Sequence, residues 1–266
     1  GPDEDAPHTA LVMVKGVIAE GEAANANTIV AGLRKAFEAE QSKAVVMVIN
    51  SPGGSPVQSG YVYDEMWRLR EKHPEKKLYA VITDLGASGG YYMAAAANNI
   101  FADKASLVGS IGVTASGFGF VGVMDKLGVE RRHFTSGEHK SFLDPFSPVK
   151  DGESDFWQQV LGGVHRQFIE VVRRGRGDRL KFSGAVDEKK MFSGLVWSGE
   201  QALELGLIDG LGSPGYVARE IIGVEEVVDY TLKTSPFDAI VAQLGVSIGR
   251  GAASSLGVSS DGLRLR

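Results

Sequence analysis

Cysteine is absent from this 266-residue sequence. Its absence excludes a thiol nucleophile, a disulfide framework and a metal site built on thiolates. Long apolar runs are also lacking, since none approaches the roughly eighteen residues that span a bilayer. Positive charge is in deficit, with 28 lysine and arginine residues against 33 acidic ones, and no basic stripe is interleaved with aromatic side chains. We therefore expect no nucleic-acid partner.

The rest of the composition is ordinary for a globular domain, with 43% hydrophobic and 23% charged residues. We expect one domain over residues 9–235, an arm at 1–8 before it and a flexible tail at 236–266 after it. Gly1 and Pro2 resemble the scar that a tag protease leaves. On that interpretation a natural N-terminal anchor has been removed.

Apolar, β-branched runs alternate with helical patterns along the first ninety or so residues. The runs at 9–19, 44–49 and 78–82 predict buried strands, and the periodic segments at 25–40 and 57–72 predict helices. This β-α-β-α order predicts an α/β fold of repeated βαβ units, with a largely parallel sheet flanked by helices. Functional loops of such folds lie at the carboxyl ends of the strands.

Shorter elements are expected in the second half of the chain. They are short strands within 100–113, a helix near 121–127, a strand at 129–135, a loop at 136–150, a helix at 153–174, a helix from the Ser198 N-cap to Gly206, a helix at 213–222 and a strand at 227–232. The loop is long enough to suggest a function. The basic run Arg173–Arg176 is predicted to be a solvated helix end.

Two glycine-rich loops follow predicted strands. One contains Gly53 and Gly54, and the other is Gly86-Ala87-Ser88-Gly89-Gly90. Small neighbours on a strand-to-helix turn let a substrate backbone approach the Ser88 hydroxyl, as in a nucleophile elbow. Serine is also a good helix N-cap, so capping is the competing interpretation of Ser88.

A serine nucleophile needs a base, and histidine is the first residue type to consider. The chain has five histidines. His8 lies in the predicted N-terminal arm, and His73 and His165 are assigned to charged helix faces. His133 and His139 remain as candidates.

Lysine is the less common base, because its pKa must fall from about 10.4 toward neutrality. Apolar surroundings can lower it by that much. Lys140 differs from the other lysines because apolar residues of the long loop flank it, namely Phe142, Leu143, Pro145 and Phe146. A solvated loop lysine is the competing interpretation of Lys140.

Five blocks follow one another in the sequence: Asn50–Ser55, Gly86–Tyr92, Gly109–Val113, Ser136–Ser141 and Val196–Asp209. In this order they resemble the bacterial signal peptide peptidase A (SppA) family in its short form, over roughly residues 9–232. The resemblance implies a fold like those of ClpP and the crotonases. One departure is Pro56, where the family often has an aliphatic residue, but proline is tolerated at the first position of a helix.

The resemblance also implies a serine peptidase with a Ser–Lys dyad and no cofactor. By motif, Ser88 is the nucleophile, Lys140 is the general base and Ser110 holds the lysine amine. The main-chain N–H groups of Gly54 and Gly89 would form the oxyanion hole. On its residues alone, Ser110 is expected to be a strand-end serine that bonds backbone.

Substrates, location and assembly are implied by the same family. The substrates would be cleaved signal peptides and related membrane-associated peptides. An N-terminal anchor would hold the catalytic domain on the extracytoplasmic (periplasmic) side of the bacterial cytoplasmic membrane. Short forms assemble into rings, here expected as an octamer in which Lys140 is donated to the neighbour's Ser88. We also expect residues 247–266 to be able to enter the peptidase grooves.

Three other functions compete with this interpretation. A crotonase-like acyl-CoA enzyme would share the fold but needs carboxylate acid and base groups. A ClpP-type Ser-His-Asp protease would replace Lys140 by a histidine. A catalytically silent scaffold would have no need of an intact Ser88 and Lys140 pair.

Overall fold

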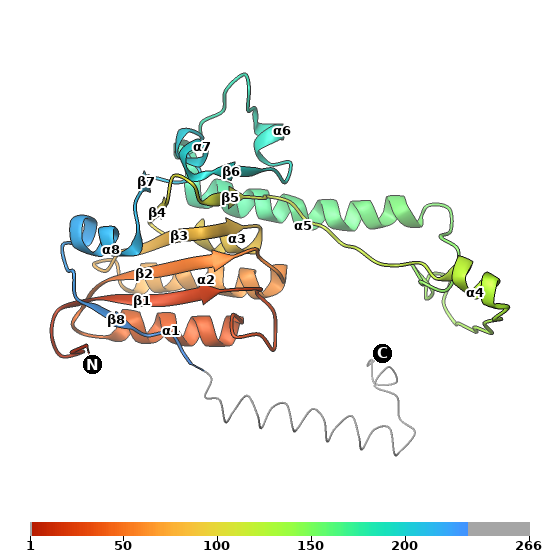
Figure 1. The fold of residues 1–266 in the computed structure, drawn as a ribbon, viewed down its shortest axis with the longest axis horizontal. Helices are drawn as coiled ribbons and strands as arrows, with labels where there is room; N and C mark the ends of the chain where they lie inside the picture. The colour runs from red at the N-terminus through yellow and green to blue at the C-terminus, as the bar shows by residue number, and fades with distance from the viewer. Residues whose placement is uncertain (1, 234–266) are drawn as a thin grey trace, which may run out of the picture.

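The computed structural model describes residues 2–233 (Figure 1). Its strands are β1 (His8–Lys15), β2 (Ser42–Ser51), β3 (Leu78–Ala87), β4 (Asn99–Ala102), β5 (Leu107–Gly109), β6 (Val196–Ser198), β7 (Gly210–Leu211) and β8 (Val227–Asp229). They form one sheet in the order β6-β5-β3-β2-β1-β8, while β4 pairs with β3 and β7 beside this path. Among the described strands, only the β5–β6 pair is antiparallel.

The helices are α1 (Ala26–Glu38), α2 (Pro56–Lys72), α3 (Gly89–Ala94), α4 (Val121–Leu127), α5 (Glu153–Arg176), α6 (Glu188–Met191), α7 (Gly199–Glu204) and α8 (Pro214–Tyr216). A 3-10 turn, η1 (Gly177–Arg179), follows α5, and a π-helical turn, η2 (Val217–Ile222), follows α8. Side-chain capping explains why several of these helices begin where they do. Asn25 forms a capping box with Thr28, and Ser198 forms one with Gln201.

Two hydrophobic cores cover the two faces of the sheet. Successive strand residues point to opposite faces, so β2 supplies Val45, Met47 and Ile49 to the core beneath α1, α2 and α3. The intervening residues Val46 and Val48 belong to the second core, which includes Val217 of η2. The expected α/β class, with a largely parallel sheet flanked by helices, is confirmed.

The end of α5 was predicted to be solvated over Arg173–Arg176, and this is correct only for Arg173 and Arg174, which are exposed. Gly175 and Arg176 are buried. Arg176 is 2% exposed and donates to both carboxylate oxygens of Asp209, at 2.8 and 3.0 Å. Gly175 lies against Ala95, where an added Cβ would be 1.8 Å from the Ala95 carbonyl oxygen. Burial by itself would raise the pKa of Asp209, but the Arg176 guanidinium outweighs it and the pKa is lowered.

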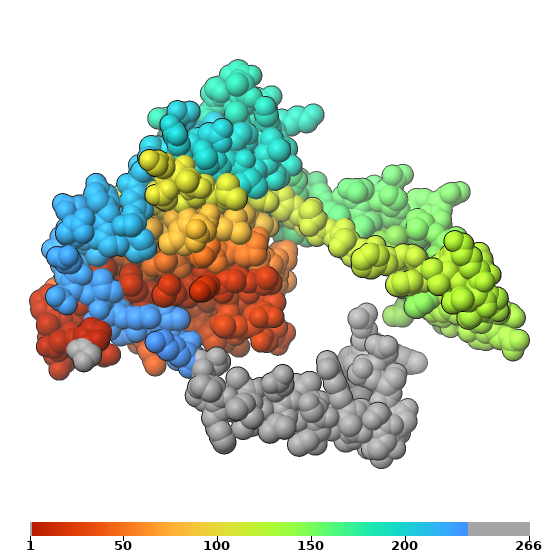
Figure 2. Space-filling model, viewed as in Figure 1, coloured from red at the N-terminus to blue at the C-terminus, as the bar shows by residue number. Residues whose placement is uncertain are grey.

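An arm formed by residues 115–160 projects from the body (Figures 1 and 2). It contains α4 and the first part of α5, and no residue from 112 to 152 is buried. Part of its loop is organised around Asp144. A hydrogen bond from the Ser147 hydroxyl, with others from the Phe146 N–H and Arg131, holds the pKa of Asp144 at about 2.

Five further sequence predictions differ from the structure. The strand predicted at 9–19 ends at Lys15. The strand predicted at 129–135 does not form, because this stretch lies on the arm and pairs with no described strand. The third strand, predicted to end at residue 82, extends to Ala87, where it pairs with β5. The last strand ends at Asp229 rather than at 232. His8 is not in a terminal arm but begins β1 with no exposed surface, and its Nε2 lies 2.9 Å from the Tyr230 hydroxyl.

Two further predictions concern the membrane and the tail. Within residues 2–233, none of the helices has the length and apolar character needed to cross a bilayer. The predicted tail at 236–266, including the segment 247–266 expected to enter a groove, lies outside the described residues.

Candidate active site

Ser88 occupies the turn between β3 and α3, and its backbone is strained. Its φ of 52° and ψ of −122° are rare for a residue with a side chain. The Ser88 N–H donates to the Gly109 carbonyl at 2.8 Å, which ties the turn to β5. The side chain makes no capping hydrogen bond to α3. The competing interpretation of Ser88 as an N-cap is therefore wrong for its hydroxyl, which is left available at the turn.

The loop after β2 places its amide groups beside this turn. The Gly53 carbonyl accepts from the Ile18 N–H at 3.0 Å. In a trans peptide the C=O and the next N–H point in opposite directions, so the Gly54 N–H points away from Ile18. A Cβ at Gly54 would lie 2.1 Å from the Ile18 carbonyl oxygen, and one at Gly53 would lie 2.5 Å from the Gly89 nitrogen. The two predicted oxyanion-hole segments are thus in contact.

Ser110 follows β5 on the other side of the turn and has a φ of 53°. Its backbone N–H donates to the Leu195 carbonyl at 2.9 Å, and its carbonyl accepts from the Gly112 N–H at 3.0 Å. The strand before it is fixed by pairing with β6. Ser110 is therefore held by main-chain bonds at the end of a short strand.

One cavity of about 690 Å³ is lined by all four predicted residues of the serine side of the site, Ser88, Ser110, Gly54 and Gly89. Its lining consists of Pro52, Gly54, Pro56, Val57, Ser88, Gly89, Tyr92, Ser110, Gly112, Val113, Thr114, Val164, Gln167, Phe168, Ser193 and Gly194. Among these described residues there is no histidine, lysine, arginine, aspartate or glutamate. Burial raises the pKa of Tyr92 above its ordinary value, so this phenol is not a base near neutral pH. The cavity of a single chain therefore holds a serine and amide donors without a base.

Lys140 lies elsewhere, on the exposed loop of the arm between α4 and α5. The aromatic residues expected to cover it contact other parts of the arm: Phe142 packs against Phe156, with ring centroids 5.5 Å apart, and Phe146 stacks on Phe120 at 5.4 Å. Lys140 is solvated within one copy of the chain. The structure does not bring it to Ser88 in that copy.

The candidate histidines of the loop are on the same arm. His133 and His139 are exposed, and neither lines the cavity. His133 contacts its own loop, with Nε2 3.3 Å from the Ser141 hydroxyl. Neither histidine replaces Lys140 as a base within one chain.

His165 corrects the assignment to a charged helix face. It is half-buried on α5, next to the cavity residue Val164, and its Nε2 lies 2.9 Å from the Ile111 carbonyl and 2.6 Å from the Phe192 carbonyl. Two acceptor oxygens require that Nε2 carries the proton and donates. His165 thus ties α5 to the segment that carries Ser110. Helical spacing alone could not reveal this, because the two carbonyls come from distant parts of the chain.

The comparison with known families bears on this cavity directly. The profile of Peptidase family S49 matches residues 70–223, which include Ser88, Ser110 and Lys140. The chain belongs to peptidase family S49. The Clp protease profile matches residues 9–104, in agreement with the ClpP-like fold expected from the sequence.

Individual relatives of this S49 chain include proteins of different lengths. It is 42% identical over 191 residues to a Na(+)/H(+) antiporter NhaA of Brucella abortus, covering 72% of this chain and 25% of that protein. It is 32% identical over 207 residues to a putative signal peptide peptidase SppA of Enterococcus faecium, covering 75% and 58%. A putative protease of Synechocystis is 33% identical over 205 residues, covering 77% and 69%. The S49 chain thus spans a quarter of the Brucella relative and somewhat over half of the Enterococcus relative.

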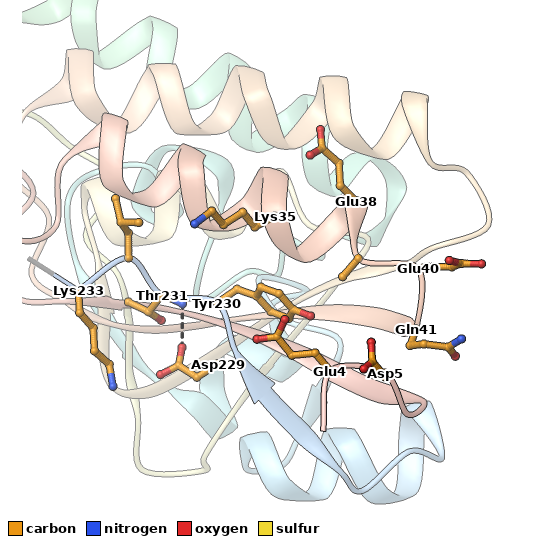
Figure 3. Close-up of a pocket in the computed structure, with 12 residues that line it drawn as sticks. Glu4, Asp5, Lys35, Glu38, Glu40, Gln41, Asp229, Tyr230, Thr231 and Lys233 are labelled. Atoms are coloured by element: carbon orange, nitrogen blue, oxygen red, sulfur yellow. Dashed lines mark hydrogen bonds between the residues drawn. The ribbon is translucent and has the colours of Figure 1, made fainter. Parts of the chain in front are cut away.

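A second hollow, of about 730 Å³, lies at the opposite edge of the sheet from β5 and β6, where α1 ends and the chain leaves β8 (Figure 3). Acidic side chains dominate its lining, including Glu4, Asp5, Glu38 and Asp229. It contains none of the predicted site residues. Within residues 2–233, no group of three or more His, Asp or Glu side chains is arranged to hold a metal ion.

Proposed function

We propose that this S49 chain is a serine endopeptidase that uses a Ser–Lys dyad, with cleaved signal peptides and related membrane-associated peptides as substrates. The observation that carries the proposal is the cavity itself. It brings together the hydroxyl of Ser88, whose backbone is strained, and the backbone amides of two glycine-rich turns. Acyl transfer needs a nucleophile and oxyanion donors of this kind. The cavity lining supplies no base, so the base has to be brought in from outside the cavity.

In this mechanism Ser88 attacks the peptide carbonyl while neutral Lys140 takes its proton. The same amine then returns the proton to the leaving amine of the substrate. The N–H groups of Gly54 and Gly89 donate to the oxyanion, and the Ser110 hydroxyl orients the lysine amine. Ser110 suits this task because it faces the same cavity as Ser88 from the other side of the turn.

The proposed assembly is a ring, an octamer, in which the arm of one subunit brings Lys140 to the Ser88 cavity of its neighbour. Support comes from the arm, in which no residue from 115 to 152 is buried, and from its exposed apolar side chains. Phe118 is 83% exposed, Leu127 is 72% exposed and Phe134 is 91% exposed. Several large apolar side chains exposed on one projecting segment favour an interaction site. Packing on a neighbour would also remove Lys140 from water, which a neutral amine requires.

The cavity walls support a preference for small apolar substrate side chains. Val57, Val113, Val164 and Phe168 supply aliphatic and aromatic surface, while Thr114 and Gln167 add neutral polar groups. We place the peptidase at the bacterial cytoplasmic membrane, with the catalytic domain on the extracytoplasmic side and an N-terminal anchor. This location is inferred from the resemblance to the signal peptide peptidase A family.

The competing functions fit the cavity less well. A crotonase-like acyl-CoA enzyme needs carboxylates, and none of the described lining residues is Asp or Glu. A ClpP-type triad needs a histidine at the serine, and His165 donates its Nε2 proton to two carbonyls instead.

Active-site labelling tests the proposal. The assembled protein is treated with a serine-directed fluorophosphonate, and the modified residue is mapped by mass spectrometry. We expect Ser88 to carry the label, and Ser88→Ala to lose both the label and peptide hydrolysis while its assembly is unchanged. Ser42→Ala, which removes a buried hydroxyl from the other end of β2, is the control and should keep both. Near-normal hydrolysis by Ser88→Ala would overturn the mechanism.

A further inference from the structure

Ser51, at the last position of β2, has a buried hydroxyl that bonds two different loops. Its side chain is 0% exposed. The hydroxyl donates to the Gly16 carbonyl at 2.6 Å and accepts from the Gly53 N–H at 3.1 Å. Its single proton is used on Gly16, so a lone pair faces Gly53. The orientation of the hydroxyl is therefore fixed.

Ser51 lies where the pairing between β2 and β3 becomes irregular. Ile49 pairs with Ile82 and Ser51 pairs with Gly86 of the Ser88 turn, so β3 advances four residues while β2 advances two, and the extra residues belong to β3. Irregular pairing of this kind is common next to active sites. The main chain of Ser51 also packs on the start of α3, since a Cβ at Gly90 would lie 3.0 Å from the Ser51 carbonyl oxygen. Ser51 thus contacts both loops that carry the proposed oxyanion donors.

Gly53 is held by hydrogen bonds at both its N–H and its carbonyl group, and the bond to Ser51 is the one that holds the N–H. Gly53 has a φ of 95° and gives its carbonyl to the Ile18 N–H at 3.0 Å. With its N–H on Ser51 and its C=O on Ile18, Gly53 has no freedom to rotate. The following N–H belongs to Gly54, which lines the cavity, and it is then held pointing away from Ile18.

We propose that Ser51 is a positioning residue of the peptidase, whose hydroxyl holds the Gly53–Gly54 peptide in the orientation that presents the Gly54 N–H to the oxyanion. This inference rests on the proposed function. A preorganised donor lowers the barrier only if it does not have to reorient during the reaction. Loss of the Ser51 hydroxyl leaves the Gly53 N–H without its partner and lets the loop turn.

The test compares Ser51→Ala, Ser51→Thr and Ser51→Cys in the assembled full chain, with Ser106→Ala as the matched control. Ser106 is equally buried, at 2% exposed, and its hydroxyl also accepts from a backbone N–H, that of Asp103 at 2.9 Å, and donates to a carbonyl. It does not line the cavity. We measure kcat and KM on a fluorogenic peptide, per site titrated with the fluorophosphonate, and the inhibition constant of a peptide aldehyde. The aldehyde adduct places an oxyanion in the hole.

For Ser51→Ala we expect kcat to fall about 10- to 100-fold, less than the roughly 100- to 1,000-fold of a deleted donor, with KM little changed. Aldehyde binding should weaken by a similar factor. Ser51→Thr, which keeps the hydroxyl, should restore most of kcat, and Ser106→Ala should leave both constants near the wild-type values. Ser51→Cys, with a weak thiol donor and acceptor, should lie between Thr and Ala, and it decides the question if Ser51→Ala does not fold.

Three results would overturn the inference while hydrolysis by the wild type stands. They are an unchanged kcat in Ser51→Ala or in its substitute Ser51→Cys, an equal loss in Ser106→Ala, and a loss confined to KM. A wild-type protein that hydrolyses no peptide would instead overturn the proposed function, and the positioning role of Ser51 would fall with it.

Discussion

Ser88 and Lys140 differ in how much of their environment one copy of the chain supplies. Ser88 has a strained backbone, a bonded N–H and small neighbours on each side. Lys140 lies on an exposed loop, where its backbone N–H donates to the Gly137 carbonyl at 3.1 Å. A hydroxyl becomes a nucleophile only when a base reaches it. The mechanism therefore depends on whether the base is the neutral amine of Lys140.

Replacing Lys140 by arginine tests that question. Arginine keeps its proton at any working pH, so Lys140→Arg should be as inactive as Lys140→Ala. We expect kcat/KM to fall by about 100-fold or more, the usual contribution of a general base. Steady-state kinetics on a fluorogenic peptide compares the two variants with wild type.

Lys150→Arg is the control for this experiment, because Lys150 is another exposed lysine of the same arm. It should keep full activity. An active Lys140→Ala beside an inactive His133→Ala or His139→Ala would transfer the role of base to a histidine.

Helix α2 carries a cluster of ion pairs centred on the buried carboxylate of Glu65. Glu65 on α2 is paired with Arg68 on the same helix and with Arg34 on α1, where Arg34 Nε lies 3.0 Å from the carboxylate. The hydrogen bond from Arg68, with a further one from Arg34, lowers the pKa of Glu65 from 4.5 to about 2. A carboxyl group with a lowered folded-state pKa stabilises the protein above its unfolded-state pKa.

We predict that Glu65→Gln weakens the acid dependence of stability. The contribution of Glu65 is fully present above pH 4.5 and is lost as the pH falls from 4.5 to about 2. At pH 7 the variant should lose on the order of 1 kcal/mol of unfolding free energy, since solvent screens the half-exposed guanidiniums. The difference from wild type should shrink on acidification. Urea unfolding at several pH values measures it.

Glu220→Gln is the matched control, because Glu220 and Arg219 form an exposed pair whose side chains are about half accessible, at 52% and 49%. It should change the unfolding free energy little at any pH. A constant difference between Glu65→Gln and wild type from pH 7 to 2 would contradict the linkage.

In the whole molecule, α5 connects the buried body of the fold to the exposed arm. One end is anchored by the buried Arg176–Asp209 pair, and the other carries an arm in which no residue from 115 to 152 is buried. An arm rich in exposed aromatic residues needs a partner surface. A neighbouring subunit would supply one, and the cavity of that neighbour lacks a base.

Mixing two inactive variants tests a shared site. Ser88→Ala and Lys140→Ala are dissociated, combined in equal amounts and reassembled, and peptide hydrolysis is measured. A Lys140→Ala subunit still supplies Ser88, and a Ser88→Ala neighbour supplies Lys140. Random assembly places this combination at about a quarter of the sites, so clear activity should return. A reassembled mixture without activity would reject the shared site.

A second mixture makes the result quantitative. Wild type is reassembled in equal amounts with the double variant that lacks both side chains. Sites within one chain would remain active at about a half of positions, whereas shared sites would be active at about a quarter. Unmixed variants provide the baseline.

Much of the architecture could be predicted from the sequence, because its causes are local. The Asn25 and Ser198 caps mark helix starts, and the apolar run in β2 indicates a strand covered on both faces. The helix predicted near 121–127 forms as α4 at Val121–Leu127. The strand at 129–135 was predicted wrongly, because pairing requires a neighbouring strand that composition cannot provide.

The amino-acid order alone reveals a serine between small residues, a glycine pair after a strand and a lysine in a long loop. Which of these residues meet depends on how the chain folds. The tertiary structure brought Ser88, Ser110, Gly54 and Gly89 to one cavity because parallel strands end at the same edge of the sheet. It also buried Arg176, because Asp209 lies opposite it in space and 33 residues away in the chain. Such contacts depend on packing between distant segments, and no local pattern contains them.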